Sequence, residues 1–195
     1  MARSRIQVVP FRRKREGKTN YNRRKKLLLA GKPRLVIRKS LKGIWLQVVE
    51  YSPEGDKILV SAHSNELKKL GWSLSTSNIP SSYLTGLLLG KKAPEKKVGK
   101  CILDIGVYPS IKGNRVYAAL KGAVDGGIDI PFSEEIMPAE DRVKGKHTKA
   151  GDAEKQFEAV KQKIIGKSEQ VQKTPKKTEG KSEQVQKTFP KTEGK

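Results

Sequence analysis

The stretch RLVIRKSLKGIWLQVVEYSPEGDKILVSAH, residues 34–63, decides the fold of this chain. Leu35 and Ile37 alternate with outward positions, and this period of two predicts a first strand with one face in the core. Arg34 and Arg38 are expected on its outer face. The turn segments LKG and SPEGD then separate two more strand patterns. The stretch therefore predicts a three-stranded antiparallel meander.

The second and third strands are expected at 44–51 and 57–63. A fourth strand is predicted at 100–105, an apolar and β-branched run between two glycines. Because a helical segment precedes it, this strand should arrive by a helical crossover and lie parallel to its neighbour. The predicted fold class is therefore α/β, with a mixed sheet of about four strands packed with helices.

Helices are predicted from caps, glycine stops and apolar periodicity. The clearest pattern is at 116–124, where apolar residues recur on one helix face between Asn114 as cap and a Gly-Gly stop. Another helix should begin near Pro80 and carry a single apolar stripe, formed by Ile79, Tyr83, Leu84, Leu87 and Leu88. Further helices are expected at 19–30, 65–70 and 139–143, and a last amphipathic helix at 152–165.

The charge of the chain is concentrated at its N-terminal end. Lysine and arginine number 42 against 20 acidic residues, which gives a net charge of +22. Residues 1–42 hold 16 basic groups and one acid, whereas residues 43–150 hold 15 basic and 12 acidic groups. Such a field predicts a polyanion as partner, because like charges repel in a lone compact state but bind phosphates by releasing counterions.

The cationic stretch is PFRRKREGKTNYNRRKKLLLAGKPRLVIRKS, residues 10–40, in which Glu16 is the only acid. Residues 1–18 form an arm with too little apolar surface to order its backbone, so we expect it to be mobile without a partner. In the following helix, residues 23–26 are all cationic and point almost all the way round its axis. A helix embedded beside an anion explains this distribution, and a single solvated face does not.

Aromatic residues are interleaved with these cations. Phe11 precedes the run RRKR, and Tyr21 lies just before RRKK. Guanidinium planes and aromatic rings both stack on unpaired bases, and the guanidinium also binds phosphate. A solvated charge run is the alternative, but the cations would then repel one another without compensation. The pattern favours nucleic-acid binding, and composition alone does not separate RNA from DNA.

The sequence carries no strong signal for catalysis, a metal or a cofactor. It lacks a G-x-x-x-x-G-K-[ST] phosphate loop, and His63 and His147 have no Cys or Asp neighbours at ligand spacing. Cys101, the one cysteine, is expected to pack in the core, and its isolation favours a reducing compartment. We therefore predict a protein that is not an enzyme and needs no cofactor.

One enzymatic alternative stays open at this point. Asp104 together with Glu134 or Glu135 could serve an RNA-modifying or nuclease reaction. A lone strand carboxylate is more often paired at a sheet edge, and two glutamates in an extended segment are more often solvated or face a partner.

The C-terminal end contains a duplication. The segment GKSEQVQKTPKKTE at 166–179 returns as GKSEQVQKTFPKTE at 180–193. The unit is too short and too poor in core positions for a solenoid, so a disordered, lysine-rich tail is expected at 166–195. The predicted organisation is an arm at 1–18, an α/β domain at 19–165 and this tail. The apolar runs fall far short of the ~20 residues of a membrane span, and the cations all round the helix at 19–30 leave no adequate apolar face for a membrane surface, so no membrane partner is expected.

Several long motifs resemble a known family. They are REGKTNYNRRKKLLLAGKPRLVIRKS (15–40), SNELKKLGW (64–72), NIPSSYLTGLLLGKKA (78–93) and RVYAALKGAVDGGIDIPFSEEIMPAEDRVKGKH (115–147). Together they closely resemble the archaeal form of the large-subunit ribosomal protein family that carries 5S rRNA, protein eighteen in the traditional numbering. The resemblance covers about residues 1–165 and does not extend to the duplicated tail.

The resemblance implies a structural constituent of the large ribosomal subunit without enzymatic activity. A family member binds 5S rRNA and helps attach it to 23S rRNA in the central protuberance. Its neighbours there are other large-subunit ribosomal proteins, including the other 5S-associated protein. The alternative is a general basic nucleic-acid-coating protein, for which duplex DNA would compete with folded RNA on equal terms.

The resemblance also assigns RNA-contacting positions. The N-terminal segment of the family matches Arg12, Arg13, Lys14, Arg15, Lys18, Tyr21, Arg23 and Arg24, and its first strand matches Lys32, Arg34, Arg38 and Lys39. The charge pattern adds Arg3, Arg5, Lys25 and Lys26 to the predicted RNA-binding residues.

Overall fold

The computed structural model describes residues 9–96, 98–148 and 152–172. Its centre is a four-stranded sheet of β1 (Arg34–Lys39), β2 (Ile44–Glu50), β3 (Lys57–His63) and β4 (Ile102–Asp104), in the order β3-β2-β1-β4. β2 pairs antiparallel with both β1 and β3, and β4 pairs parallel with β1. The predicted mixed sheet, a meander with one parallel strand added, is confirmed.

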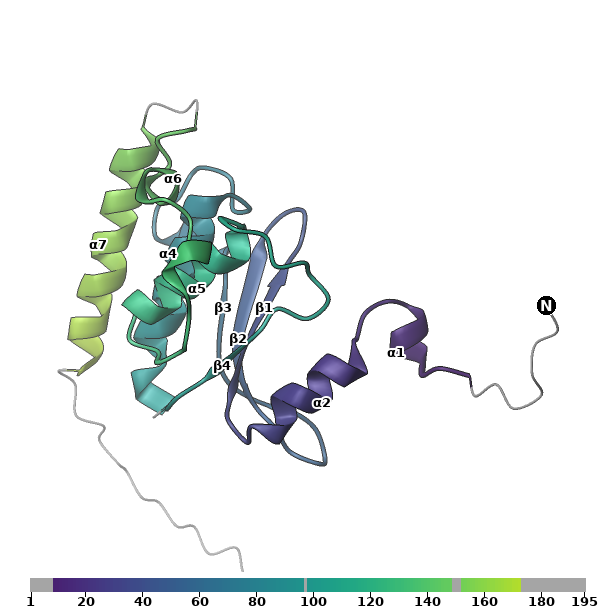
Figure 1. Cartoon of the computed structure of the whole chain (residues 1–195). Coiled ribbons are helices and arrows are strands. Elements are labelled where there is room, and N and C mark those ends of the chain that lie inside the picture. Colours follow the sequence, from purple (N-terminus) through teal and green to yellow (C-terminus); the bar gives the residue numbers. More distant parts are fainter. Residues whose placement is uncertain (1–8, 97, 149–151, 173–195) are drawn as a thin grey trace, which may run out of the picture.

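The described part of the chain also contains helices, most of which lie on one side of this sheet. They are α1 (Arg12–Arg15), α2 (Tyr21–Leu29), α3 (Glu66–Lys69), α4 (Ile79–Lys92), α5 (Arg115–Asp125), α6 (Glu140–Lys144) and α7 (Ala153–Gln172), with 3-10 turns η1 (Pro94–Lys96) and η2 (Glu134–Ile136). Figure 1 shows α4 and α5 against one side of the sheet, with α7 beyond α4. The helices α1 and α2 lie apart from this stack.

The core has two parts because α4 lies between two layers. Leu35, Leu46 and Leu120 belong to a cluster between the sheet and the α4–α5 pair. Leu84 and Phe157 belong to a second cluster that joins α4 to α7. The inward face predicted for the first strand is confirmed, since Leu35 and Ile37 are fully buried.

The single stripe expected on α4 is wrong, because this helix is buried on almost every side. Ser81, Ser82 and Thr85 are buried along with the predicted apolar residues, whereas Leu88 is only half-buried. The buried hydroxyls bond to the helix backbone, as Thr85 Oγ1 does to the Ser81 carbonyl at 2.7 Å. Small polar residues can therefore lie between the two layers without leaving a polar group unsatisfied.

Glycines allow α4 and α5 to approach each other closely. A Cβ at Gly86 would overlap the Ala119 carbonyl oxygen, and a Cβ at Gly122 would overlap the Tyr83 carbonyl oxygen. The extent predicted for α5 is confirmed, with Asn114 at its N-cap, although the Asn114 side chain makes no capping hydrogen bond. The helix pair thus rests on backbone contact as well as on apolar packing.

The last helix is longer than expected. α7 buries Phe157, Val160 and Ile164 as its amphipathic pattern predicts, but it continues past 165 to Gln172. The first residues of the predicted disordered tail are therefore helical. The rest of that tail, 173–195, lies outside the described residues.

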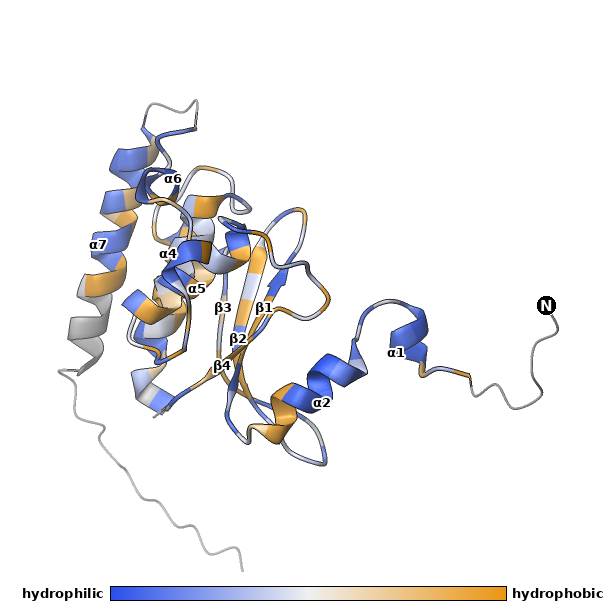
Figure 2. Ribbon diagram, viewed as in Figure 1, coloured by the Kyte–Doolittle hydropathy of each residue, from blue (hydrophilic) through white to orange (hydrophobic). Residues whose placement is uncertain are grey.

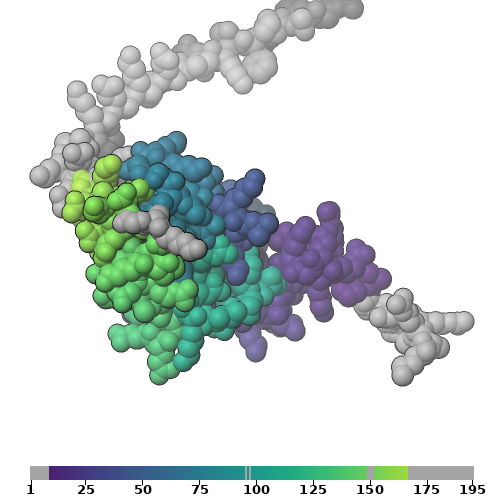
Figure 3. Space-filling model, turned by 90° about the horizontal axis from the view of Figure 1, so that it is seen from above, coloured from purple at the N-terminus to yellow at the C-terminus, as the bar shows by residue number. Residues whose placement is uncertain are grey.

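Hydrophilic and apolar residues are distributed differently in the N-terminal helices and in the sheet. Figure 2 shows hydrophilic residues along α1 and the first part of α2, and apolar residues at the end of α2 and within the sheet. In the view of Figure 3, the purple N-terminal region protrudes from the side of the body. Residues 10–29, with α1 and α2, therefore form a cationic projection from the body that surrounds the sheet.

Candidate nucleic-acid interface

The helix α2 is the central element of the cationic projection, and its ends are set by the sequence. Asn20 is extended and caps the helix, with its Oδ1 accepting the Arg23 N–H at 3.1 Å. Gly31 has φ of 60°, a left-handed conformation suited to the chain just past a helix end. The helix predicted at 19–30 is thereby confirmed, and Asn20 is the cap.

The four consecutive cations of α2 divide into two pairs. Arg23 Nη1 donates to the Gly106 carbonyl at 2.7 Å, and Arg24 Nη2 donates to both carboxylate oxygens of Asp56 at 3.0 Å. Lys25 and Lys26 are exposed. Part of the all-round distribution of charge therefore serves to hold the helix on the domain, which the sequence pattern did not indicate.

The solvent exposure predicted for Arg34 is wrong. Its side chain is only 2% exposed and forms ion pairs with Asp104 at 3.1 Å and with Asp56 at 2.7 Å. Its Nε is buried and has no hydrogen-bond partner among the described residues. Arg34 lies on the sheet face away from α4 and α5, as expected, but Asp56 of the 52–56 turn and Asp104 of β4 meet its guanidinium there. It is a structural cation and is not part of the exposed surface.

Arg38 continues this network toward solvent. Its Nη2 pairs with Asp104 Oδ1 at 3.2 Å, and its Nη1 donates to the Asp104 carbonyl at 2.8 Å. The Gly106 N–H also donates to Asp104 Oδ1, at 2.8 Å. The Arg38 side chain is 43% exposed, so a fixed guanidinium remains accessible at the surface.

The network thus links α2, the 52–56 turn, β1 and β4 through alternating charges, in the order Arg24, Asp56, Arg34, Asp104 and Arg38. Partial burial raises the pKa of Asp56, but hydrogen bonds from Arg24 and Arg34 outweigh it and leave the pKa below the usual value. Asp56 is therefore ionised at neutral pH, as the ion pairs require.

The arm folds against itself and against α2 in its described part. Phe11 lies 5.2 Å from Tyr21 between ring centroids, and Arg13 Nε donates to Thr19 Oγ1 at 2.9 Å. Glu16 accepts from Arg12 and from Lys18, each at 2.8 Å. The hydrogen bond from Arg12, followed by that from Lys18, lowers the pKa of Glu16. One acid thereby compensates two of the arm's cations, and Lys14 and Arg15 remain exposed.

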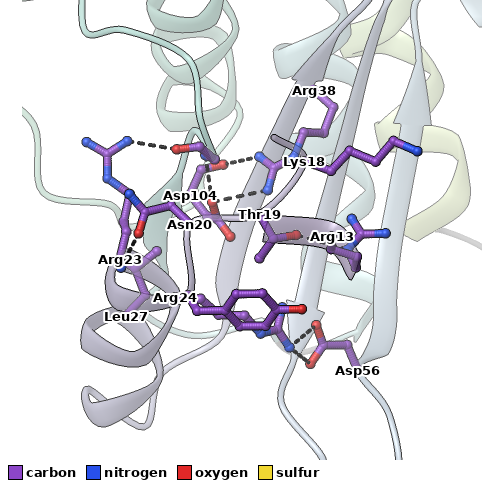
Figure 4. Close-up of a pocket in the computed structure, with 12 residues that line it drawn as sticks. Arg13, Lys18, Thr19, Asn20, Arg23, Arg24, Leu27, Arg38, Asp56 and Asp104 are labelled. Carbon is purple, nitrogen blue, oxygen red and sulfur yellow. Dashed lines mark hydrogen bonds and ion pairs between the residues drawn. The ribbon is translucent and has the colours of Figure 1, made fainter. Parts of the chain in front are cut away.

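A pocket of about 500 Å³ opens where the arm, α2 and the sheet meet (Figure 4). Its lining consists of Arg13, Lys18, Thr19, Asn20, Tyr21, Arg23, Arg24, Leu27, Arg38, Asp56, Asp104 and Gly106. Cations outnumber acids in this lining, and both acids are already paired with arginines. The charge and the polar groups of the pocket suit the binding of a phosphate. The Tyr21 ring suits stacking with a base.

The predicted site residues fall into five groups. Six line the pocket, namely Arg13, Lys18, Tyr21, Arg23, Arg24 and Arg38. Arg12, Lys14, Arg15, Lys25, Lys26 and Lys32 are exposed around it, while Lys39 lies over the Tyr108 ring with Nζ 5.1 Å from the centroid. Arg34 is buried. Arg3 and Arg5 lie outside the described residues.

Sequence reasoning missed the acids that organise this surface. Asp56 was expected only as part of a turn, and nothing in the sequence indicates that it meets Arg24 and Arg34. Asp104 was considered for catalysis and, alternatively, as a paired strand carboxylate, and the structure pairs it with two arginines. An exposed, unpaired carboxylate for the nuclease alternative is therefore not available at Asp104.

The other candidate residues have ordinary structural roles. Cys101 is buried, and this burial raises the pKa of its thiol to about 11, so the reactive thiolate is disfavoured. His63 Nδ1 accepts the Asn65 N–H at 3.0 Å. In the part of the chain that the structure describes, no cluster of His, Cys, Asp or Glu could hold a metal ion. None of the described helices is long and apolar enough to cross a membrane.

Comparison with known families agrees with this charged surface. The model of the family of ribosomal large subunit proteins, 60S L5 and 50S L18, matches residues 4–99 and 91–133. The chain belongs to this ribosomal protein family. The match spans the arm, α2, the whole sheet, α4 and α5, so the pocket and the network lie within it.

Membership of the family identifies the class of partner of the cationic surface. A large-subunit ribosomal protein is an rRNA-binding constituent of a ribonucleoprotein, and the family is structural and not enzymatic. This ribosomal protein therefore functions in the cytoplasmic ribosome, in an assembly of rRNA and other large-subunit proteins. Its concentration of positive charge at residues 1–42 accords with such a partner.

Proposed function

We propose that this ribosomal protein binds 5S rRNA and helps attach it to 23S rRNA in the central protuberance, next to the other 5S-associated protein. The observation that carries the proposal is the cation-lined pocket between the arm, α2 and the sheet. The sequence motifs that resemble the 5S-binding family supply the choice of RNA.

The arm and α2 have different roles in this proposal. The arm brings exposed cations that can follow a phosphate backbone as it bends, because only its contacts to Thr19 and Tyr21 link it to α2 in the described part. α2 is fixed in advance by Arg23 and Arg24, so its remaining lysines meet the RNA with little loss of freedom. Arg38 presents a guanidinium that Asp104 already orients.

The experiment measures the affinity of the full chain for 5S rRNA as a function of salt. If ~8 phosphates are neutralised, the logarithm of the affinity should fall with the logarithm of salt concentration at a slope of roughly −6 to −7. A slope near zero, or equal affinity for 5S rRNA and an unrelated folded RNA at physiological salt, would contradict the proposal.

Competition, cleavage and dissociation assays separate the alternatives. Duplex DNA that displaces 5S rRNA on equal terms would favour a general nucleic-acid-coating protein. A nuclease would cleave RNA in the presence of magnesium, and we expect no cleavage because Asp104 is held by Arg34 and Arg38. When native ribosomes are dissociated, the chain should leave with the 5S particle.

A further inference from the structure

Trp45 occupies an unusual position on the open face of the sheet. Its neighbours in β2, Ile44 and Leu46, are buried toward the helices, whereas Trp45 points the other way and is 52% exposed. Single exposed apolar residues are common on protein surfaces, so exposure alone carries no argument. The residues around its ring distinguish Trp45 from such single residues.

His63 orients the indole. The two rings lie 5.5 Å apart between centroids at an angle of 86°, an edge-to-face arrangement across the β2–β3 pair. The Asn65 N–H donates to His63 Nδ1, which fixes the imidazole and puts the proton of its neutral form on Nε2. The orientation of the indole is therefore fixed before any ligand binds, and its exposed part is a preorganised aromatic surface.

Arg38 connects this ring to the cationic pocket. In the β1–β2 register, Arg38 lies directly opposite Trp45, so their side chains are neighbours on the same sheet face. Arg38 also lines the pocket beside α2. Hydrogen bonds to Asp104 hold the Arg38 guanidinium on the β4 side, so an RNA strand that leaves the pocket over it would cross β1 to reach Trp45.

We propose that Trp45 is a stacking platform for an unpaired base of the bound rRNA, with Arg38 holding the adjoining phosphate. This inference rests on the proposed function. An RNA base is favoured over a protein side chain because the neighbouring surface is cationic and continuous with the pocket, and because aromatic rings beside arginine suit splayed-out nucleotides.

Fluorescence provides a direct test because the chain has two tryptophans with opposite environments. Trp72 is 2% exposed and donates its Nε1–H to the Ser75 carbonyl at 3.1 Å, whereas Trp45 is open to solvent. Acrylamide, a neutral quencher, should reach Trp45 in the free full chain, and Trp45→Phe should remove the quenchable emission. Saturating 5S rRNA should protect Trp45 from the quencher.

Affinity provides the second readout. Trp45→Ala should weaken 5S rRNA binding by roughly 5- to 150-fold, the loss expected of one base–aromatic stack, with an unchanged salt slope because no phosphate contact is removed. Trp45→Phe should recover part of the loss. Ile58→Ala is the matched control, since Ile58 is 53% exposed on the same sheet but cannot stack, and its affinity should equal that of the wild type.

The outcomes separate the two proposals. If the wild type binds 5S rRNA selectively but Trp45 stays open to acrylamide, or Trp45→Ala binds equally well, the platform is refuted and the proposed function stands. Protection that appears only when large-subunit proteins are added identifies a protein occupant and also refutes the platform. Failure of the wild type to prefer 5S rRNA refutes both.

Discussion

Arg34 is a buried cation that forms ion pairs with two acids, Asp56 and Asp104. Removing one member of a buried, hydrogen-bonded charge network leaves its partners uncompensated in a medium of low polarity, which costs far more than losing a surface pair. Arg24 and Arg38 remain on the two acids when Arg34 is removed, so part of the compensation survives.

We therefore expect Arg34→Met to lower the free energy of unfolding by about 3 kcal/mol, at the lower end of the range for broken buried pairs. Urea denaturation measures this change. Arg15→Met is the control, since Arg15 is exposed and should change stability by less than about 0.5 kcal/mol. Combining Arg34→Met with Asp104→Asn should show a coupling of about 0.5 to 3 kcal/mol, and additive effects would contradict the network.

Asp56 makes the network sensitive to acid. Its pKa is lowered in the folded protein, so its ion pairs stabilise the fold fully above the unfolded pKa of about 3.9 and lose this effect as the pH falls through the folded pKa. We compare the free energy of unfolding of the wild type with that of Asp56→Asn. The difference should be constant near neutral pH and shrink below about pH 4. A difference that is the same at neutral and strongly acidic pH would show that Asp56 does not act through its charge.

At the scale of elements, the α4–α5 contact depends on glycine as well as on apolar surface. The Cβ of an alanine at 122 would overlap the Tyr83 carbonyl oxygen, which belongs to a helix backbone held between two layers and cannot move aside easily. The two helices would have to separate, with loss of packing in both core clusters.

Gly122→Ala should therefore destabilise the protein by about 1 to 3 kcal/mol although alanine is the better helix former. Gly166→Ala is the matched control, because Gly166 lies in α7 with no atom near its missing Cβ. That substitution should be neutral or stabilise by up to about 1 kcal/mol. Thermal unfolding measures the change in stability of each variant. Equal changes for Gly122→Ala and Gly166→Ala would mean that α4 and α5 are not in backbone contact.

At the scale of the whole molecule, binding and folding are carried by different parts. The body holds both core clusters, while the described part of the arm buries no residue in α1. Deletion of residues 1–18 removes seven cations, and the described residues among them, 9–18, belong to neither core cluster.

This deletion should reduce both the affinity for 5S rRNA and the steepness of its salt dependence, and leave the unfolding transition close to that of the wild type. Ile37→Asp is the opposite case, because it buries a charge in the sheet core and should abolish folding and binding together. Binding titrations and circular dichroism distinguish the two variants. An arm deletion that unfolds the domain would contradict this division.

The sequence by itself determined that the chain forms an antiparallel meander with one parallel strand added. It also determined most helix positions and the concentration of positive charge at the N-terminal end. These features depend on local periodicity, caps and turns, which act between residues near one another in the chain. The family resemblance followed from the same local motifs, and the family match bears it out.

Only the tertiary structure decided which cations are exposed. Arg34 and Arg38 look alike in an alternating strand, yet Asp56 and Asp104 come from distant segments to bury one and orient the other. In the same way, α4 looks like a surface helix with one stripe until α7 covers its second side. Burial and ion pairing depend on what lies opposite a side chain in space, and the periodicity of a single element does not contain that information.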